Sequence, residues 1–156
     1  MSNSFQQIIE SIQVKNPWES YEKLEAELEI GFSRNDHGSI NEALDKAETN
    51  ARRAHHLLST AKLERARWEI DNDAQWSRIK TEAQAELQRE KDVGKRSKMI
   101  TEGDISVRIA TMFPEIWLQS ERKRSEMKVL EESMTNLVEL WVSRCRSLQT
   151  MLAKSR

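Results

Sequence analysis

The fold is decided by one uninterrupted stretch, residues 39–92: SINEALDKAETNARRAHHLLSTAKLERARWEIDNDAQWSRIKTEAQAELQREKD. It contains no Gly or Pro, and most of its residues are strong helix formers: Ala, Leu, Glu, Lys, Arg and Gln. Ser39 and Glu42 have the spacing of a capping box, which predicts that a helix begins there. A single helix of ~54 residues would extend about 80 Å at 1.5 Å per residue. We therefore expect a helix much longer than those of an ordinary globular domain.

Apolar and small residues recur along this stretch at heptad spacing, with a four-residue slip near Asn72. The positions are Ile40, Leu44, Ala47, Ala51, Ala54, Leu58, Ala61, Trp68, Trp76, Ile79, Ala83 and Leu87. Such a pattern is typical of a coiled-coil seam. Its first half is rich in Ala, which lets a partner helix approach closely.

The chain after this helix predicts a turn, a short helix and a second long helix. The first helix should stop near Gly94, Thr101 to Asp104 should cap a short helix through about Met112, and Pro114 should open the last helix. That helix carries its own seam with one slip, at Met127, Leu130, Met134, Leu137, Trp141, Cys145, Leu148 and Leu152. The fold class is therefore all-α: a long antiparallel helical hairpin, or coiled-coil-like bundle, that forms a homo-oligomer through the last seam.

The chain before residue 39 differs from the rest in charge. Apolar residues at Phe5, Ile8, Ile9 and Ile12 predict a short helix, and a cap at Asn16 to Glu19 predicts a second one that ends near Gly31. Residues 1–50 carry four basic and ten acidic side chains, a net charge of −6, which leaves +5 for residues 51–156. We therefore expect two domains. An acidic N-terminal helical arm occupies residues 1–38, and a helical hairpin at 39–156 comprises helix 39–92, a basic connector with a short helix at 93–113, and helix 114–153.

Searches for catalytic chemistry find no convincing site. The histidines are His37, in a predicted loop, and the adjacent His55 and His56, which point about 100° apart on a helix and are poorly placed to share a metal. Cys145 lies on an apolar seam without a spaced His, so a buried structural thiol is favoured over a nucleophile. No Gly-rich phosphate loop is present. We expect no enzyme activity, no metal and no cofactor.

Cellular location is suggested by what the sequence lacks. The single cysteine fits a reducing compartment, and no apolar run approaches the ~20 residues that cross a bilayer. The N-terminus lacks the basic start and apolar core of a signal peptide. The expectation is a cytoplasmic protein with no membrane partner.

Two basic clusters are the candidate binding residues. The connector cluster is Arg89, Lys91, Lys95, Arg96 and Lys98, and the second cluster is Arg122, Lys123 and Arg124. An antiparallel hairpin would bring both toward one end, where Gly94 would give the backbone freedom to follow a phosphate chain. Charge runs on long helices are usually solvated faces, and that simpler interpretation stays open. Trp117 lies one and a half turns before Arg122; packing at the hairpin corner with Phe113 is favoured there over stacking on an unpaired base.

The arrangement of residues 40–153 resembles the UvsY-type recombination mediators of T-even and related phages. The likeness rests on the long charged helix, the basic stretch 89–98, the restart MITEGDI at 99–105 and the closing helix SEMKVLEESMTNLVELWVSRCRSLQTML at 125–152. The resemblance implies a ring-like homo-oligomer that binds single-stranded DNA and helps a RecA-like recombinase replace single-strand binding protein. It also implies DNA contacts in stretch 89–98 and assembly through 127–152. Residues 1–38 have no counterpart, and a structural or adaptor coiled coil without nucleic-acid binding is the alternative.

Overall fold

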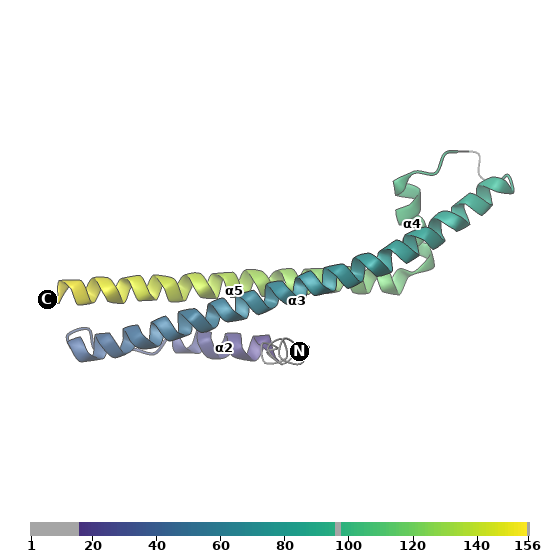
Figure 1. Ribbon diagram of the computed structural model, residues 1–156. Coiled ribbons are helices and arrows are strands. Elements are labelled where there is room, and N and C mark those ends of the chain that lie inside the picture. The colour runs from purple at the N-terminus through teal and green to yellow at the C-terminus, as the bar shows by residue number, and fades with distance from the viewer. Residues whose placement is uncertain (1–15, 96–97, 156) are drawn as a thin grey trace, which may run out of the picture. The chain divides into compact units, whose positions relative to one another are not determined.

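All secondary structure in the described part of the chain is helical. The computed structural model describes residues 16–95 and 98–155. Its helices are α2 (Pro17–Glu27), α3 (His37–Asp92), α4 (Glu102–Met112) and α5 (Pro114–Lys154) (Figure 1). The all-α prediction is therefore confirmed, and no strand occurs within these ranges. The helix expected at residues 5–12 lies outside the described residues.

Helix α3 begins two residues earlier than expected because Asp36, not Ser39, caps it. The Asp36 carboxylate accepts a 3.1 Å hydrogen bond from the N–H of Gly38, which satisfies a free donor of the first turn. The Ser39 hydroxyl instead accepts from the N–H of Ser33 at 3.0 Å and fixes the preceding loop. The capping box predicted at Ser39 and Glu42 is therefore wrong.

The other predicted helix starts are confirmed. The Asn16 side chain accepts from the N–H of Glu19 at 3.3 Å, with Pro17 in the first turn of α2. Thr101 and Asp104 form a reciprocal capping box at the start of α4. Helix α2 ends at Glu27, four residues before the predicted end at Gly31.

The described residues divide into two compact units, and both long helices contribute to each of them. Unit 1 contains residues 16–64 and 128–155, and unit 2 contains residues 65–95 and 98–127. The acidic segment 16–36 thus belongs to the same unit as the start of α3. The compact units divide the chain at other positions and do not test whether residues 1–38 form a separate arm. That arm therefore stays a prediction.

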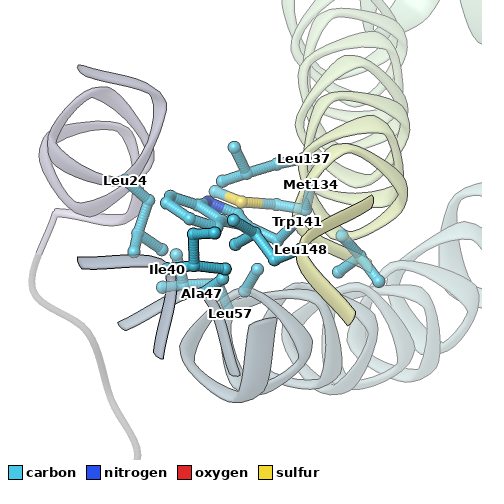
Figure 2. Packing of buried hydrophobic residues seen from close by; sticks show 10 residues of the cluster. Leu24, Ile40, Ala47, Leu57, Met134, Leu137, Trp141 and Leu148 are labelled. Carbon is cyan, nitrogen blue, oxygen red and sulfur yellow. The ribbon is translucent and has the colours of Figure 1, made fainter. Parts of the chain in front are cut away.

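Unit 1 is a three-helix packing in which α3 and α5 run antiparallel. His37, at the start of α3, and Ser155, just beyond α5, form a hydrogen bond of 3.1 Å. Figure 2 shows the side chains of α2, α3 and α5 pointing toward one another. The buried core consists of Leu24, Ile40, Ala47, Ala54, Leu57, Met134, Leu137, Val138, Trp141 and Leu148.

This core includes the residues that were expected to join copies of the chain. Met134 and Leu137 are 0 % exposed, Leu148 is 1 % exposed and Trp141 is 2 % exposed within a single chain. An intact second copy cannot contact side chains that α2 and α3 already cover. These four residues therefore form an intrachain core, and assembly of copies through this seam stays a prediction. Leu130, Leu152 and Met127 stay partly exposed.

Arg144 attaches the loop after α2 to α5. Its guanidinium donates to the carbonyl oxygens of Leu28 and Ile30, the latter at 2.6 Å. It also lies 5.8 Å from the ring centroids of Phe32 and Trp141. Charge-assisted hydrogen bonds and two aromatic contacts from one side chain hold α2 against the rest of unit 1.

In unit 2, α4 packs against the last turns of α3 (Figure 1). The buried residues are Ile79, Ala83 and Leu87 from α3 with Ile105 and Ile109 from α4. Near the predicted heptad slip, the Ser120 hydroxyl donates to the Asn72 amide oxygen at 2.7 Å and accepts from the Trp76 indole N–H at 3.3 Å. The antiparallel pairing of α3 and α5 in this unit is fixed partly by polar contacts.

Candidate nucleic-acid interface

The connector cluster begins where α3 ends, and the geometry of that end is well defined. Gly94 adopts φ = 75°, the left-handed conformation that commonly terminates helices. The N–H of Gly94 donates to the carbonyl of Lys91 at 3.1 Å, and the N–H of Lys95 donates to the carbonyl of Glu90 at 2.9 Å. This pair of bonds is a Schellman motif. Gly94 thus ends α3, as the sequence predicted, and does so through a fixed hydrogen-bonded conformation.

Arg108 on α4 neutralises the acidic side chains beside the connector. Its two terminal nitrogens lie 3.1 Å from the Glu86 carboxylate and 2.8 Å from the Glu90 carboxylate. Both glutamates stand on α3 within the last two turns before Asp92. Arg108 on α4 therefore compensates the negative charge of these two glutamates. The glutamates then offset less of the positive charge of the neighbouring connector cations.

The described cations of the connector are exposed and form no ion pair with described acids. They are Arg89, Lys91, Lys95 and Lys98, whereas Arg96 lies outside the described residues. Asp92, the remaining acid of the stretch, accepts a hydrogen bond from the Gln88 side chain at 2.9 Å. Arg89 and Lys91 lie in the last turn of α3, where positive charges interact favourably with the negative end of the helix dipole. Part of their role is therefore to stabilise the helix.

The second basic cluster lies far from the connector, in contrast to the single patch that was expected. The Arg124 guanidinium lies 5.8 Å from the ring centroid of Trp68 and 2.5 Å from the Glu121 carboxylate. Trp68 precedes Arg89 on α3 by about 31 Å, at 1.5 Å per residue. The hairpin does not close at the connector, because α4 occupies the space beside the last turns of α3. Arg122 and Lys123 are exposed, as is Arg124.

Trp117 differs from its favoured prediction. Phe113 packs against the core of unit 2, as expected for a corner residue. Trp117 is 43 % exposed and lines a hollow of about 320 Å³ together with Trp76 and Lys80. Of these two aromatic residues, Phe113 packs the corner, whereas the Trp117 ring is accessible to solvent.

Polar groups with catalytic or ligand potential are few in the described ranges. No group of three or more His, Cys, Asp or Glu side chains there could hold a metal ion. Burial, followed by repulsion from the Glu48 carboxylate, raises the pKa of the Cys145 thiol and keeps it protonated. No described helix combines the length and apolarity needed to cross a bilayer.

Sequence reasoning did not identify Arg108, Lys80 or Trp76 as residues near the candidate interface. Arg108 lies 18 and 22 positions from its two glutamates, and no helical periodicity connects residues on different helices. Trp76 was expected only as a seam residue. Lys80 did carry a signal, because it precedes Lys91 by three helical turns and shares its face of α3.

Comparison with protein-family models, with curated proteins and with solved structures gives no match to this chain.

Proposed function

We propose that this protein is a non-enzymatic, single-stranded DNA binding protein that contacts the phosphate chain through the connector cluster. The supporting observation is the exposure of Arg89, Lys91, Lys95 and Lys98 without acidic partners among the described residues, beside glutamates already held by Arg108. Cations arranged in this way attract phosphates irrespective of base sequence. A flexible strand can follow the narrow end of a helix, whereas a stiff duplex touches it at only a few phosphates.

The biological role that fits this activity is mediation of recombination by a homo-oligomer. Several copies of a weak phosphate site raise affinity through effective concentration. The resemblance to UvsY-type proteins supports a role in which the oligomer helps a RecA-like recombinase displace single-strand binding protein. Sedimentation of the purified chain measures the subunit number, and recombinase ATPase activity on strands coated with single-strand binding protein measures mediation.

Fluorescence anisotropy with an oligo(dT) strand tests DNA binding directly. Five phosphate contacts predict that log K falls with log salt with a slope of about −3.5. The triple variant Lys95→Glu, Arg96→Glu and Lys98→Glu should abolish binding. The matched control replaces the exposed Arg52 and Arg53 of unit 1 by Glu and should retain most of the affinity. Absence of binding by the unmodified protein at low salt would refute the proposal.

An adaptor role is the second candidate, and it is favoured by a different surface. A hollow of about 540 Å³ lies between α2 and α3 of unit 1, and the buried Leu24 and Leu57 line it together with polar and charged residues. Such a surface suits a protein segment better than a phosphate chain. An oligo(dT) titration at low salt in which the unmodified protein causes no change of anisotropy would favour this role.

A further inference from the structure

The hollow beside Trp117 is built by three helices of unit 2. Trp76 and Lys80 come from α3, Ile105 and Ile109 come from α4, and Trp117 comes from the start of α5. Its volume of about 320 Å³ is at the lower end of the range for small-molecule sites. Apolar side chains form one half of the lining, and the other half is polar: Ser77, Lys80, Glu102 and Ser106. A flat group with apolar faces and polar edges therefore fits best.

The two indole rings differ in their contacts and in their exposure to solvent. The Trp76 ring is anchored, because its N–H donates to the Ser120 hydroxyl at 3.3 Å. The Trp117 ring is 43 % exposed and packs against no other aromatic ring in the described part of the chain. Trp117 therefore offers a free π face beside a fixed wall.

The two charged residues that line the hollow pair with each other, whereas the cations outside it are available to phosphates. Lys80 inside it is paired with Glu102, 3.1 Å between ammonium and carboxylate, and the Glu102 carboxylate repels phosphate. Lys91 lies three helical turns beyond Lys80 on the same face of α3, about 16 Å away. On the other side, Arg124 follows Trp117 by seven residues, about two helical turns, and so lies on the same face of α5. A strand running from the connector to the second cluster would pass the hollow.

We propose that this hollow receives an unpaired base of the bound strand, stacked on Trp117, while the phosphates stay on the cations outside. The inference rests on the proposed function and specifies how the same interface distinguishes single strands from duplex. In a duplex the base faces are already stacked and cannot enter, whereas every unpaired base has a free face. The separated basic clusters then become two ends of one track with a base site between them.

Two oligonucleotides and two tryptophan variants test this inference. The strands are oligo(dT) and an abasic phosphodeoxyribose chain of the same length, which carries the phosphates without bases. The variants are Trp117→Ala and, as matched control, Trp18→Ala, since Trp18 is 41 % exposed but lies on α2 of unit 1. Loss of one stacking partner should weaken oligo(dT) binding about tenfold.

The expected pattern is specific to the base-bearing strand. Trp117→Ala should weaken binding of oligo(dT) but leave the abasic chain unchanged, and Trp18→Ala should leave both unchanged. Trp117→Phe, which keeps a smaller ring, should recover part of the lost affinity. Circular dichroism should show equal helix content in all variants.

Other outcomes separate the inference from the proposed function. Undiminished oligo(dT) binding by Trp117→Ala would overturn base stacking while leaving phosphate binding intact. An equal loss for both strands would also overturn it, because the effect would not depend on bases. If the unmodified protein binds neither strand at low salt, the proposed function itself fails.

Discussion

The indole N–H of Trp76 and the hydroxyl of Ser120, 44 residues later in the chain, are joined by a hydrogen bond of 3.3 Å. The same hydroxyl donates to the Asn72 amide oxygen at 2.7 Å, and both Asn72 and Ser120 are buried. A one-turn shift between α3 and α5 in unit 2 would leave these groups without partners. This chain of polar contacts therefore selects one register in a region where the apolar pattern slips.

Removal of the central hydroxyl should be costly. In Ser120→Ala the Trp76 N–H loses its acceptor and the Asn72 oxygen loses its donor, so we expect the free energy of unfolding to fall by about 1–3 kcal/mol. Urea unfolding followed by circular dichroism measures this loss. Ser125→Ala changes an exposed serine of the same helix and unit and should be nearly neutral. Equal effects of the two substitutions would contradict a special role for Ser120.

Arg144 should control the attachment of α2. Arg144→Gln shortens the donor and removes the charge, so the carbonyls of Leu28 and Ile30 lose hydrogen bonds worth about 1–3 kcal/mol. Trypsin cleavage after Arg34, in the loop that follows α2, should become faster. The exposed Arg146 provides the control substitution to Gln. Unchanged cleavage in Arg144→Gln would show that α2 is held by its apolar contacts alone.

Leu137 tests whether the seam of α5 stabilises one chain or an assembly. Because Leu137 is 0 % exposed within the chain, Leu137→Ala should lower the free energy of unfolding by about 2–5 kcal/mol. The loss should be the same at low and high protein concentration. A loss that grows as the protein is diluted would place Leu137 between subunits. Leu140→Ala, on an exposed face of α5, is the control.

Cys145 should react slowly with alkylating reagents at neutral pH. Burial and the Glu48 carboxylate raise the pKa of this thiol above its ordinary value of 9.0, and the thiolate is the reactive form. Iodoacetamide labelling should accelerate with pH through a midpoint above 9.0, and urea should move that midpoint down. The same shift means that the thiol's contribution to stability is present below 9.0 and is lost as pH rises through the folded-state pKa. A midpoint at or below 9.0 in the folded protein would contradict this assignment.

Arg108 should influence DNA binding without touching the strand. Arg108→Gln frees the Glu86 and Glu90 carboxylates beside the connector cations, and the added repulsion should weaken oligo(dT) binding about two- to fivefold. The effect should shrink at high salt because exposed charges are screened. The further substitutions Glu86→Gln and Glu90→Gln should restore the affinity. A loss that persists in the triple variant would indicate a packing defect instead.

The helices were predictable because their signals are local. Asn16, Pro17, Thr101 and Asp104 act on backbone groups within a few residues, and those starts agree with the structure. The prediction of where α3 begins was wrong because Asp36 and Ser39 are both good N-cap residues, and only the loop conformation decides between them. Sequence spacing does not contain that information.

The arrangement between helices was harder to predict for a physical reason. Heptad spacing marks Leu137 and Trp141 as buried without saying whether another chain or the same chain covers them. The structure supplies α2 as the extra cover through Leu24. Likewise, Arg124 is separated from Arg89 because α4 packs against the end of α3. The residue pattern of one helix does not show where another helix packs along it.

Gly94 fixes the direction in which the connector leaves the end of α3. No heavy atom lies within 4 Å of the position where a Cβ would be, so its φ of 75°, rather than crowding, is what excludes other residues. If α3 continued by one residue, every cation that follows would turn by about 100° around the helix axis. A substitution at Gly94 that changes no charge would thus change the direction in which the connector leaves α3, and with it the direction of Lys95 and Lys98.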